Sequence, residues 1–165
     1  MTTPDLLDKI LAGLRRLGDG AAVVGALDGV TATHLAYSEF GTVHAPARPT
    51  LSPATDEATA SIMRSVQRQV TDVLDGRGRG TTAQEVVAGP ARDLAELVRD
   101  RIDGNTQPDL AASTKAARRR TGRDTRTLVD TGDMMRGIAV ESSDDPDAFA
   151  EGTAPEKRRR RRRKT

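Results

Sequence analysis

The sequence predicts an α+β fold in which a small antiparallel sheet, with a β-hairpin, packs against two to three helices, followed by a disordered basic C-terminal tail. Three observations lead to this prediction: apolar residues at helical spacing, β-prone runs around one Asp-Gly pair, and a closing run of arginines. The length of 165 residues suits one compact body. We therefore expect a single α+β domain over residues 1–141 and a flexible acidic-then-polybasic tail over residues 142–165.

The first two predicted elements are a helix and a hairpin. Thr3 and Pro4 form a typical helix start, and leucine and isoleucine then recur along one face until Gly18. Asp28-Gly29 separates two β-prone runs, and this pair favours a type I′ turn, which needs positive φ at both central positions. The pattern predicts a hairpin from about residue 21 to residue 40.

A stiff loop and a long helix are predicted next. The prolines at 46 and 49 favour extended backbone in residues 41–51. Ser52-Pro53 then predicts a helix start, and Asp75-Gly76 its end. Apolar residues follow the helical period between these limits: Ala58, Ile62, Val66, Val70, Val73 and Leu74.

The second half of the chain contains a hinge, a third helix and a polar arm. Residues 76–80 alternate glycine and arginine, which is typical of a hinge. Thr82 and Glu85 form a capping-box pattern that opens a helix, and Pro90 is expected to kink or restart it before it stops at Gly104.

Residues 105–126 are polar, basic and weakly periodic, so we expect an arm there. Order is expected to return from Leu128, with a helical turn at Met134-Met135 and a short strand that ends near Val140.

The composition predicts a modest core. The chain has no Trp, one Tyr and two Phe, so Ala, Val, Leu and Ile must fill the interior, and these bury less area than aromatic side chains. A lone subunit built this way is marginal, and association supplies the missing burial. The chain has no Cys, which excludes disulfides. No run approaches the roughly 18 apolar residues of a membrane span, so we expect no membrane partner.

The charge is distributed unevenly. The net charge is +2, but the C-terminal run of eight basic residues leaves the rest of the chain at −6. Such a run binds polyanions with strong salt dependence, either DNA or an acidic neighbouring protein. No aromatic residue is interleaved to stack on bases, so we expect no sequence-specific reading. The predicted polyanion-binding residues are Lys157, Arg158, Arg159, Arg160, Arg161, Arg162, Arg163 and Lys164.

One tripeptide matches a catalytic motif. Asp130-Thr131-Gly132 is the active-site sequence of aspartic proteases, in which two such loops share one proton between their carboxylates. Those enzymes place a small residue after the glycine, whereas Asp133 follows here and few, mostly charged residues remain downstream. We interpret Asp130 as the cap of the Met134-Met135 turn and expect no catalytic residue.

Other candidate sites lack the spacing that their chemistry needs. Residues 76–80 follow a helix and contain no Lys, unlike a phosphate-binding P-loop. His34 and His44 have no second ligand at metal-binding spacing. Four acidic residues near the tail lack the pattern of a calcium loop: Asp144, Asp145, Asp147 and Glu151. We therefore expect no cofactor and no metal.

Several short motifs resemble the phage tail-completion and virion-morphogenesis proteins, which belong to the head-tail connector or neck. In that family a strand ending in Glu-Phe-Gly-Thr leads into a Pro-Ala-Arg-Pro-Phe-Leu-type loop and a long helix. The corresponding residues are Tyr37-Ser38-Glu39-Phe40-Gly41-Thr42 and Pro46-Ala47-Arg48-Pro49-Thr50-Leu51. Further matches are Pro108-Asp109-Leu110, Ser113-Thr114, Leu128-Val129-Asp130-Thr131-Gly132, Met135 and Ile138. The resemblance spans roughly residues 6–140; Thr50 replaces an aromatic residue, and the arginine tail departs from the family pattern.

The resemblance implies a structural virion protein of a tailed phage that performs no chemistry. Such a subunit commonly forms a hexameric ring that joins the capsid portal complex to the tail around the DNA channel. The implied partners are adaptor or stopper neck proteins and tail tube or terminator proteins. The resemblance also implies that the protein is located in the neck or tail of the virion and is assembled in the host cytoplasm. We expect Arg48 to pair with a carboxylate or a backbone carbonyl of a neighbouring subunit. The expected subunit interface comprises Glu39, Phe40, Gly41, Thr42, Pro46, Arg48, Pro49 and Leu51.

Two other functions stay open at this point. One is a DNA-binding accessory protein that acts through the polybasic tail. The other is an aspartic-protease-like enzyme built on Asp130-Thr131-Gly132.

Overall fold

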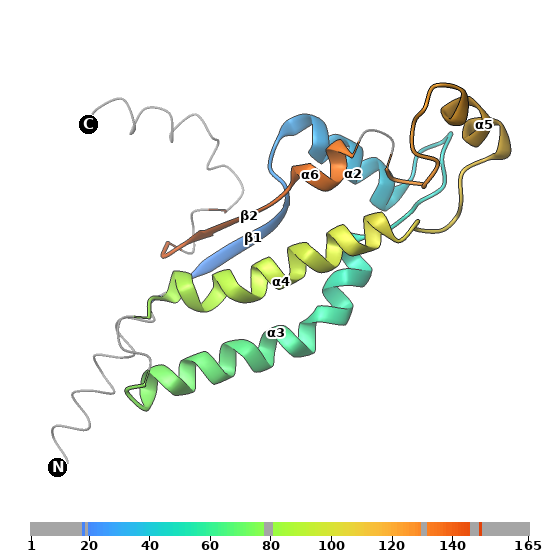
Figure 1. The fold of residues 1–165 in the computed structure, drawn as a ribbon. Helices are drawn as coiled ribbons and strands as arrows, with labels where there is room; N and C mark the ends of the chain where they lie inside the picture. The colour runs from blue at the N-terminus through green and yellow to red at the C-terminus, as the bar shows by residue number, and fades with distance from the viewer. Residues whose placement is uncertain (1–17, 19, 78–80, 130–131, 146–148, 150–165) are drawn as a thin grey trace, which may run out of the picture. The chain divides into compact units, whose positions relative to one another are not determined.

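The computed structural model describes residues 18, 20–77, 81–129, 132–145 and 149 (Figure 1). The α+β class is confirmed, with a two-stranded antiparallel sheet and several helices. The elements in chain order are β1 (Ala21–Ala26), α2 (Gly29–Phe40), α3 (Leu51–Leu74), α4 (Ala83–Asp103), α5 (Ala112–Arg120), α6 (Asp133–Gly137) and β2 (Ile138–Ser143).

The sheet differs from the predicted hairpin in its second strand. Residues 30–37, expected as a strand, belong to α2, and β1 pairs instead with β2. The Asp-Gly pair begins a helix because the Asp28 carboxylate accepts the Thr31 amide at 2.8 Å. This hydrogen bond lowers the pKa of Asp28. The predicted strand near Val140 is confirmed as β2.

The described residues group into two compact units. Of the described residues, the first unit contains those up to Val23, those in Val66–Ala88 and those from Glu141 onward. The second contains those in Val24–Ser65 and Gly89–Val140. Both long helices contribute residues to each unit. The predicted domain boundary at 141/142 lies inside β2.

The second unit is built around an apolar core without aromatic residues, as the composition predicts. Its fully buried members include Val98, Ile102 and Ile138. α2 and α6 approach closely at Gly137, where an added Cβ would lie 2.5 Å from the Thr31 methyl carbon. The core cluster consists of Leu35, Ala54, Ala95, Val98, Ile102, Val129 and Ile138.

The first unit confirms the predicted start of the third helix. The Thr82 amide donates to the Glu85 carboxylate at 3.0 Å, and the Glu85 amide donates to the Thr82 hydroxyl at 3.3 Å. The Gln84 amide donates to the Asp144 carboxylate at 2.9 Å, which ties this helix start to the residues after β2. The same helix continues through Pro90.

Several predictions fall on residues outside the described ranges. These are the N-terminal helix, part of the glycine-rich hinge, Asp130 and Thr131, and the polybasic tail. The predicted turn at Met134-Met135 is confirmed as α6. Its N-cap residue is Gly132 and not Asp130 as predicted, and no side chain donates or accepts a capping hydrogen bond there. The polar arm contains one helix, α5, which the weak periodicity of its sequence did not reveal.

Candidate functional site

The candidate site is the end of α2 together with the loop that leads into α3, and Glu39 organises it. Its carboxylate is buried and accepts the amides of Thr50 at 2.8 Å, Leu51 at 3.0 Å and Ser52 at 2.8 Å. It also accepts the Ser52 hydroxyl. The first turn of a helix has amides without intrahelical partners, and a carboxylate there satisfies them and complements the helix dipole. Glu39 therefore caps α3 from the preceding helix.

The hydrogen bonds at this cap determine the charge state of Glu39. Burial alone raises the pKa of a carboxyl group. The hydrogen bonds from Ser52 and from the backbone amides of Thr50 and Leu51 outweigh that effect, so the pKa of Glu39 lies below its ordinary value. The carboxylate is therefore ionised at neutral pH.

The loop from Gly41 to Thr50 folds back against α2. Gly41 ends the helix with a φ of 74°, and an added Cβ would lie 2.8 Å from the Ala47 amide nitrogen. Only glycine fits both requirements. The Thr42 amide donates to the Ala45 carbonyl at 2.8 Å, and the Arg48 amide donates to the Ser38 carbonyl at 2.6 Å. These bonds fix the loop.

Arg48 links the loop to the segment after α4. Its Nε donates to the Pro108 carbonyl at 2.6 Å and its Nη2 to the Asp109 carbonyl at 3.4 Å. Within the chain, this guanidinium therefore binds backbone carbonyls, which is one of the two partner types expected of it. Pairing of Arg48 with a neighbouring subunit stays a prediction.

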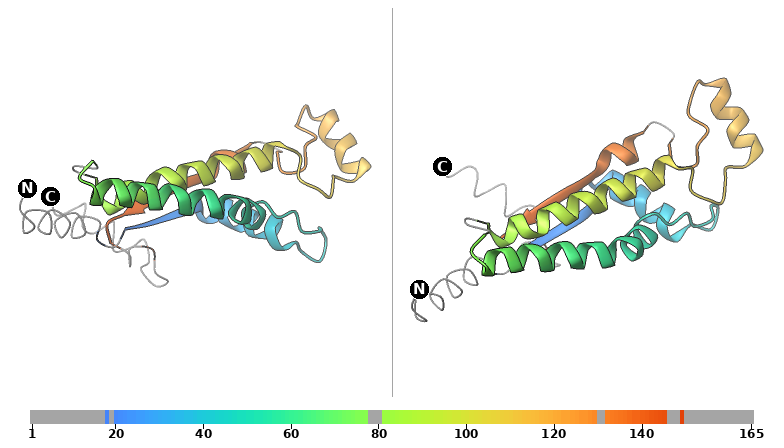
Figure 2. Two further views of the ribbon diagram at one scale, coloured as in Figure 1. Left: turned by 90° about the horizontal axis from the view of Figure 1, so that it is seen from below. Right: turned by 60° about the horizontal axis from the view of Figure 1, so that its bottom comes forward.

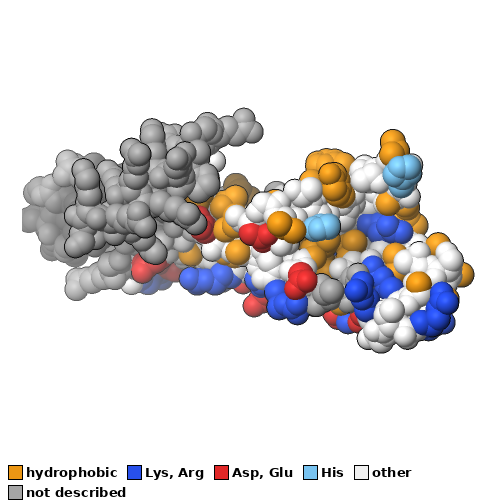
Figure 3. Space-filling view, turned by 90° about the horizontal axis from the view of Figure 1, so that it is seen from above, with side chains coloured by type: hydrophobic (Ala, Val, Ile, Leu, Met, Phe, Trp, Pro, Cys, Tyr) orange, Lys and Arg blue, Asp and Glu red, His pale blue; other side chains and the backbone are white. Residues whose placement is uncertain are grey.

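An exposed apolar face lies directly on this scaffold. Phe40 is 82% exposed and Val43 is 94% exposed, and Val30 and Tyr37 are also exposed. Val30, Tyr37 and Phe40 are spaced by seven and three residues, so they lie on one side of α2. Val43 is exposed on the loop that follows α2. Hydrophobic side chains are exposed near the two histidines in Figure 3. We call Val30, Tyr37, Phe40 and Val43 the α2 face.

The predicted interface residues separate into two groups. Glu39, Gly41 and Arg48 hold the loop in place, and Leu51 packs against the core cluster. The other four residues are exposed: Phe40, Thr42, Pro46 and Pro49. Whether either group contacts a second subunit stays a prediction.

Sequence reasoning missed Val30, Tyr37 and Val43 as surface candidates. The prediction of a strand over residues 30–37 hid the helical spacing of Val30 and Tyr37, which was the available signal.

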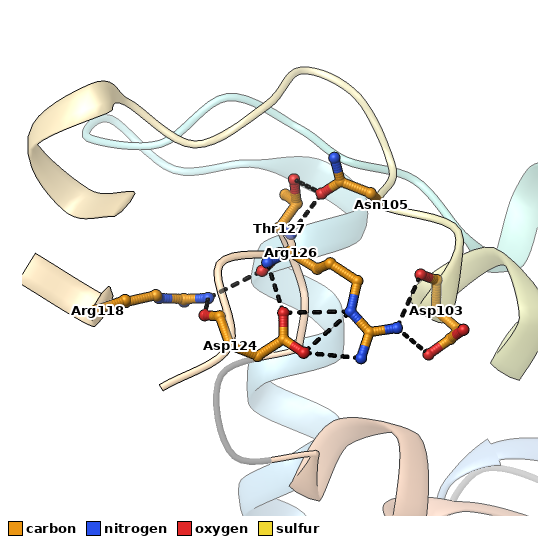
Figure 4. A network of polar contacts seen from close by, with 6 residues as sticks. All are labelled: Asp103, Asn105, Arg118, Asp124, Arg126 and Thr127. Atoms are coloured by element: carbon orange, nitrogen blue, oxygen red, sulfur yellow. Dashed lines mark hydrogen bonds and ion pairs between the residues drawn. The ribbon is translucent and has the colours of Figure 1, made fainter. Parts of the chain in front are cut away.

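A second polar network holds the segment around α5 (Figure 4). The Arg126 guanidinium binds the Asp124 carboxylate, with a shortest N–O distance of 2.7 Å, and also the Asp103 carboxylate. The hydrogen bond from Arg126 lowers the pKa of Asp124 to about 2. Arg118 donates to the Arg126 carbonyl at 2.9 Å, and the Thr127 hydroxyl donates to Asn105 at 2.9 Å. This network fixes the base of the arm.

The described part of the chain offers no cluster of three metal-ligating side chains. No helix in the described ranges is long and apolar enough to cross a membrane. Asp130, Thr131 and the eight basic tail residues lie outside those ranges. His34 and His44 are exposed on α2 and on the loop.

Comparison with protein-family models, curated proteins and solved structures finds no match for this chain.

Proposed function

We propose that this chain is a structural subunit of a tailed-phage virion, a tail-completion or head-tail connector protein that forms a ring between the capsid portal complex and the tail. The observation that carries the proposal is the α2 face, an exposed apolar surface mounted on a loop fixed by Glu39 and Arg48.

The placement of the aromatic residues supports an assembly role. Tyr37 and Phe40 are two of the chain's three aromatic residues, and both are exposed although the core lacks aromatic side chains. A monomer gains stability by burying such side chains. Interfaces, in contrast, are enriched in aromatic residues, and a few of them carry most of the binding energy. The exposed aromatics therefore fit a surface that a neighbouring subunit covers.

The rigidity of the loop supports the same role. A preorganised surface loses less conformational entropy on binding than a mobile one. The Glu39 cap and the two Arg48 hydrogen bonds hold the loop without help from another chain. Closed rings of identical subunits are a common way to bury such a surface. Six copies, with adaptor or stopper proteins and tail tube or terminator proteins as neighbours, are the arrangement that the family resemblance implies.

The test compares assembly of the wild type with that of Phe40→Ser/Val43→Ser. We expect wild-type rings by mass measurement and negative stain, and loss of rings in the double variant with unchanged circular dichroism. Met63→Ser is the matched control because Met63 is an exposed apolar residue of α3. In phage lysates the double variant should leave heads and tails unjoined. A wild type that stays monomeric and binds DNA would instead identify an accessory DNA-binding protein.

A further inference from the structure

The helix α5 is basic and exposed, and none of its residues is buried. The chain from Leu110 to Arg123 contains five basic residues and no acidic one. Within the arm, Lys115 binds the Asp109 carboxylate, and Arg118 donates to backbone carbonyls. Arg119 and Arg120 are exposed and have no carboxylate partner among the described residues.

One side of α5 combines small side chains with an arginine. Ser113, Ala116, Ala117 and Arg120 follow the spacing i, i+3, i+4 and i+7, so they share one face, and all four are exposed. Arg119 flanks this face. Small side chains let a helix backbone approach a partner closely, and an arginine at the end of the face can reach acidic groups at the rim. This face can therefore pack against an acidic groove.

The second unit, which contains α5, also contains an acidic groove. It lies between α3 and α4, which are side by side in Figure 2. Its volume is about 420 Å³, and the residues that line it include the apolar Ala58, Ile62 and Leu97. Asp93, Glu96 and Asp100 line its α4 side at spacings of three and four residues. None of these three carboxylates has a hydrogen bond or ion pair within the described ranges. Like charges at these spacings destabilise a helix, so a cationic partner would relieve the repulsion.

We propose that α5 of one subunit docks into the α3–α4 groove of the next subunit. The proposal rests on the proposed ring function and names one of its contacts. Such a contact joins two different surfaces, and head-to-tail contacts of this kind close a ring when the rotation allows it. Within one chain α5 lies beyond the end of α4 (Figure 2), and no α5 residue lines the groove. A second copy therefore supplies the occupant.

The side chains of the arm favour the groove over nucleic acid as the partner of α5. The segment carries no aromatic side chain for stacking on bases. In the groove, apolar lining residues lie beside unpaired carboxylates, which matches the small and basic groups on α5.

The experiment reverses the charges of each surface in the full-length chain. The arm variant is Arg119→Glu/Arg120→Glu, and the groove variant is Asp93→Lys/Glu96→Lys; all four positions are exposed. We expect either variant alone to assemble only at a protein concentration about tenfold or more above that of the wild type, with unchanged circular dichroism. An equimolar mixture should assemble again, because an alternating ring of even number pairs every acidic arm with a basic groove and every basic arm with an acidic groove.

The control is Arg64→Glu/Arg92→Glu, which changes the charge equally at exposed positions outside the groove lining and should assemble like the wild type. Normal assembly of the arm variant, or no recovery in the mixture, would overturn this contact while the ring function stands. A wild type that is monomeric at every concentration would overturn both.

Two further results would assign α5 or the groove to another partner and overturn the proposal. The first is normal assembly of the arm variant with weaker binding of a duplex DNA probe. The second is loss of assembly on deleting residues 157–164 while the arm variant assembles normally.

Discussion

The carboxylate of Glu39, in the last turn of α2, accepts the backbone amide of Thr50 at 2.8 Å, immediately before α3 begins. A residue in the last turn of one helix therefore caps the start of the next. The surface proposed for assembly lies on α2 and on the loop between the two helices, so the placement of its loop residue, Val43, depends on this buried group.

Removing the charge of Glu39 should destabilise the fold. The two carboxylate oxygens of Glu39 accept four hydrogen bonds. In Glu39→Gln, an NH₂ group takes the place of one oxygen and faces backbone donors, to which it cannot bond as an acceptor. We expect a loss of about 1–3 kcal/mol in the free energy of unfolding, measured by urea denaturation at fixed protein concentration. Glu57→Gln is the control, because its exposed ion pair with Arg101 should contribute at most about 1 kcal/mol. Equal effects of the two variants would contradict the capping role.

The Asp124–Arg126 pair should make stability sensitive to acid. The pKa of Asp124 falls from 3.8 to about 2 in the folded chain. A carboxyl group whose folded pKa is lowered contributes stability above its unfolded pKa and loses it as the pH falls through the folded value. The contribution should therefore be complete above pH 3.8 and disappear toward about 2.

Urea midpoints measured across this window should fall more steeply for the wild type than for Asp124→Asn. Asp56→Asn removes an exposed carboxylate of α3 and should keep the wild-type slope. Identical slopes for all three proteins would show that the pair does not contribute.

Two buried threonines should respond oppositely to the same substitution. The Thr50 hydroxyl has no hydrogen-bond partner among the described residues, whereas the Thr127 hydroxyl donates to Asn105 at 2.9 Å. Valine has nearly the same shape but no hydroxyl. Thr50→Val should raise the free energy of unfolding by about 1 kcal/mol, because a buried polar group without a partner is unfavourable. Thr127→Val should lower it by a similar amount, and changes of the same sign would refute this account.

Arg48 should matter for the loop more than for the core. Arg48→Ala removes the hydrogen bonds to Pro108 and Asp109 and is expected to cost about 1 kcal/mol of stability. Hydrogen exchange of the loop amides should accelerate, and ring assembly should weaken. Arg48→Lys should rescue only in part, because an ammonium group lacks the planar fork that reaches both carbonyls. Full rescue by lysine would mean that charge alone matters.

Deleting residues 157–164 tests the polybasic run separately from the arm. If six tails surround a DNA path, they bring 6 × 8 positive charges near it. The deletion should then leave rings intact, weaken DNA binding steeply and lower the DNA content of particles. Normal DNA content with heads that lack tails would show that the run binds a neighbouring neck protein instead. Normal values of both would show that the run is dispensable.

The two long helices could be predicted because their signals are local. The period of apolar residues in α3 and the capping box of α4 depend on residues within a few positions of each other. Asp28-Gly29 was ambiguous because a carboxylate in that position can also cap a helix, and the Thr31 amide decides between the two outcomes.

The organisation of the candidate site depends on contacts that sequence spacing does not show. Glu39 reaches the start of a later helix, and Arg48 reaches carbonyls about 60 residues away. The resemblance indicated the right segment, but the α2 face became visible only when residues 30–37 proved helical.

The pairing of β1 with β2 has a consequence for synthesis. The two strands are separated by roughly 110 residues, so β1 leaves the ribosome long before its partner exists. Ile138, which fills the core of the second unit, belongs to that late strand. Closing so long a loop costs chain entropy that only the finished contacts repay. A chain that is released early therefore lacks both the second strand and a central core residue, which ties the folded subunit to the completion of translation.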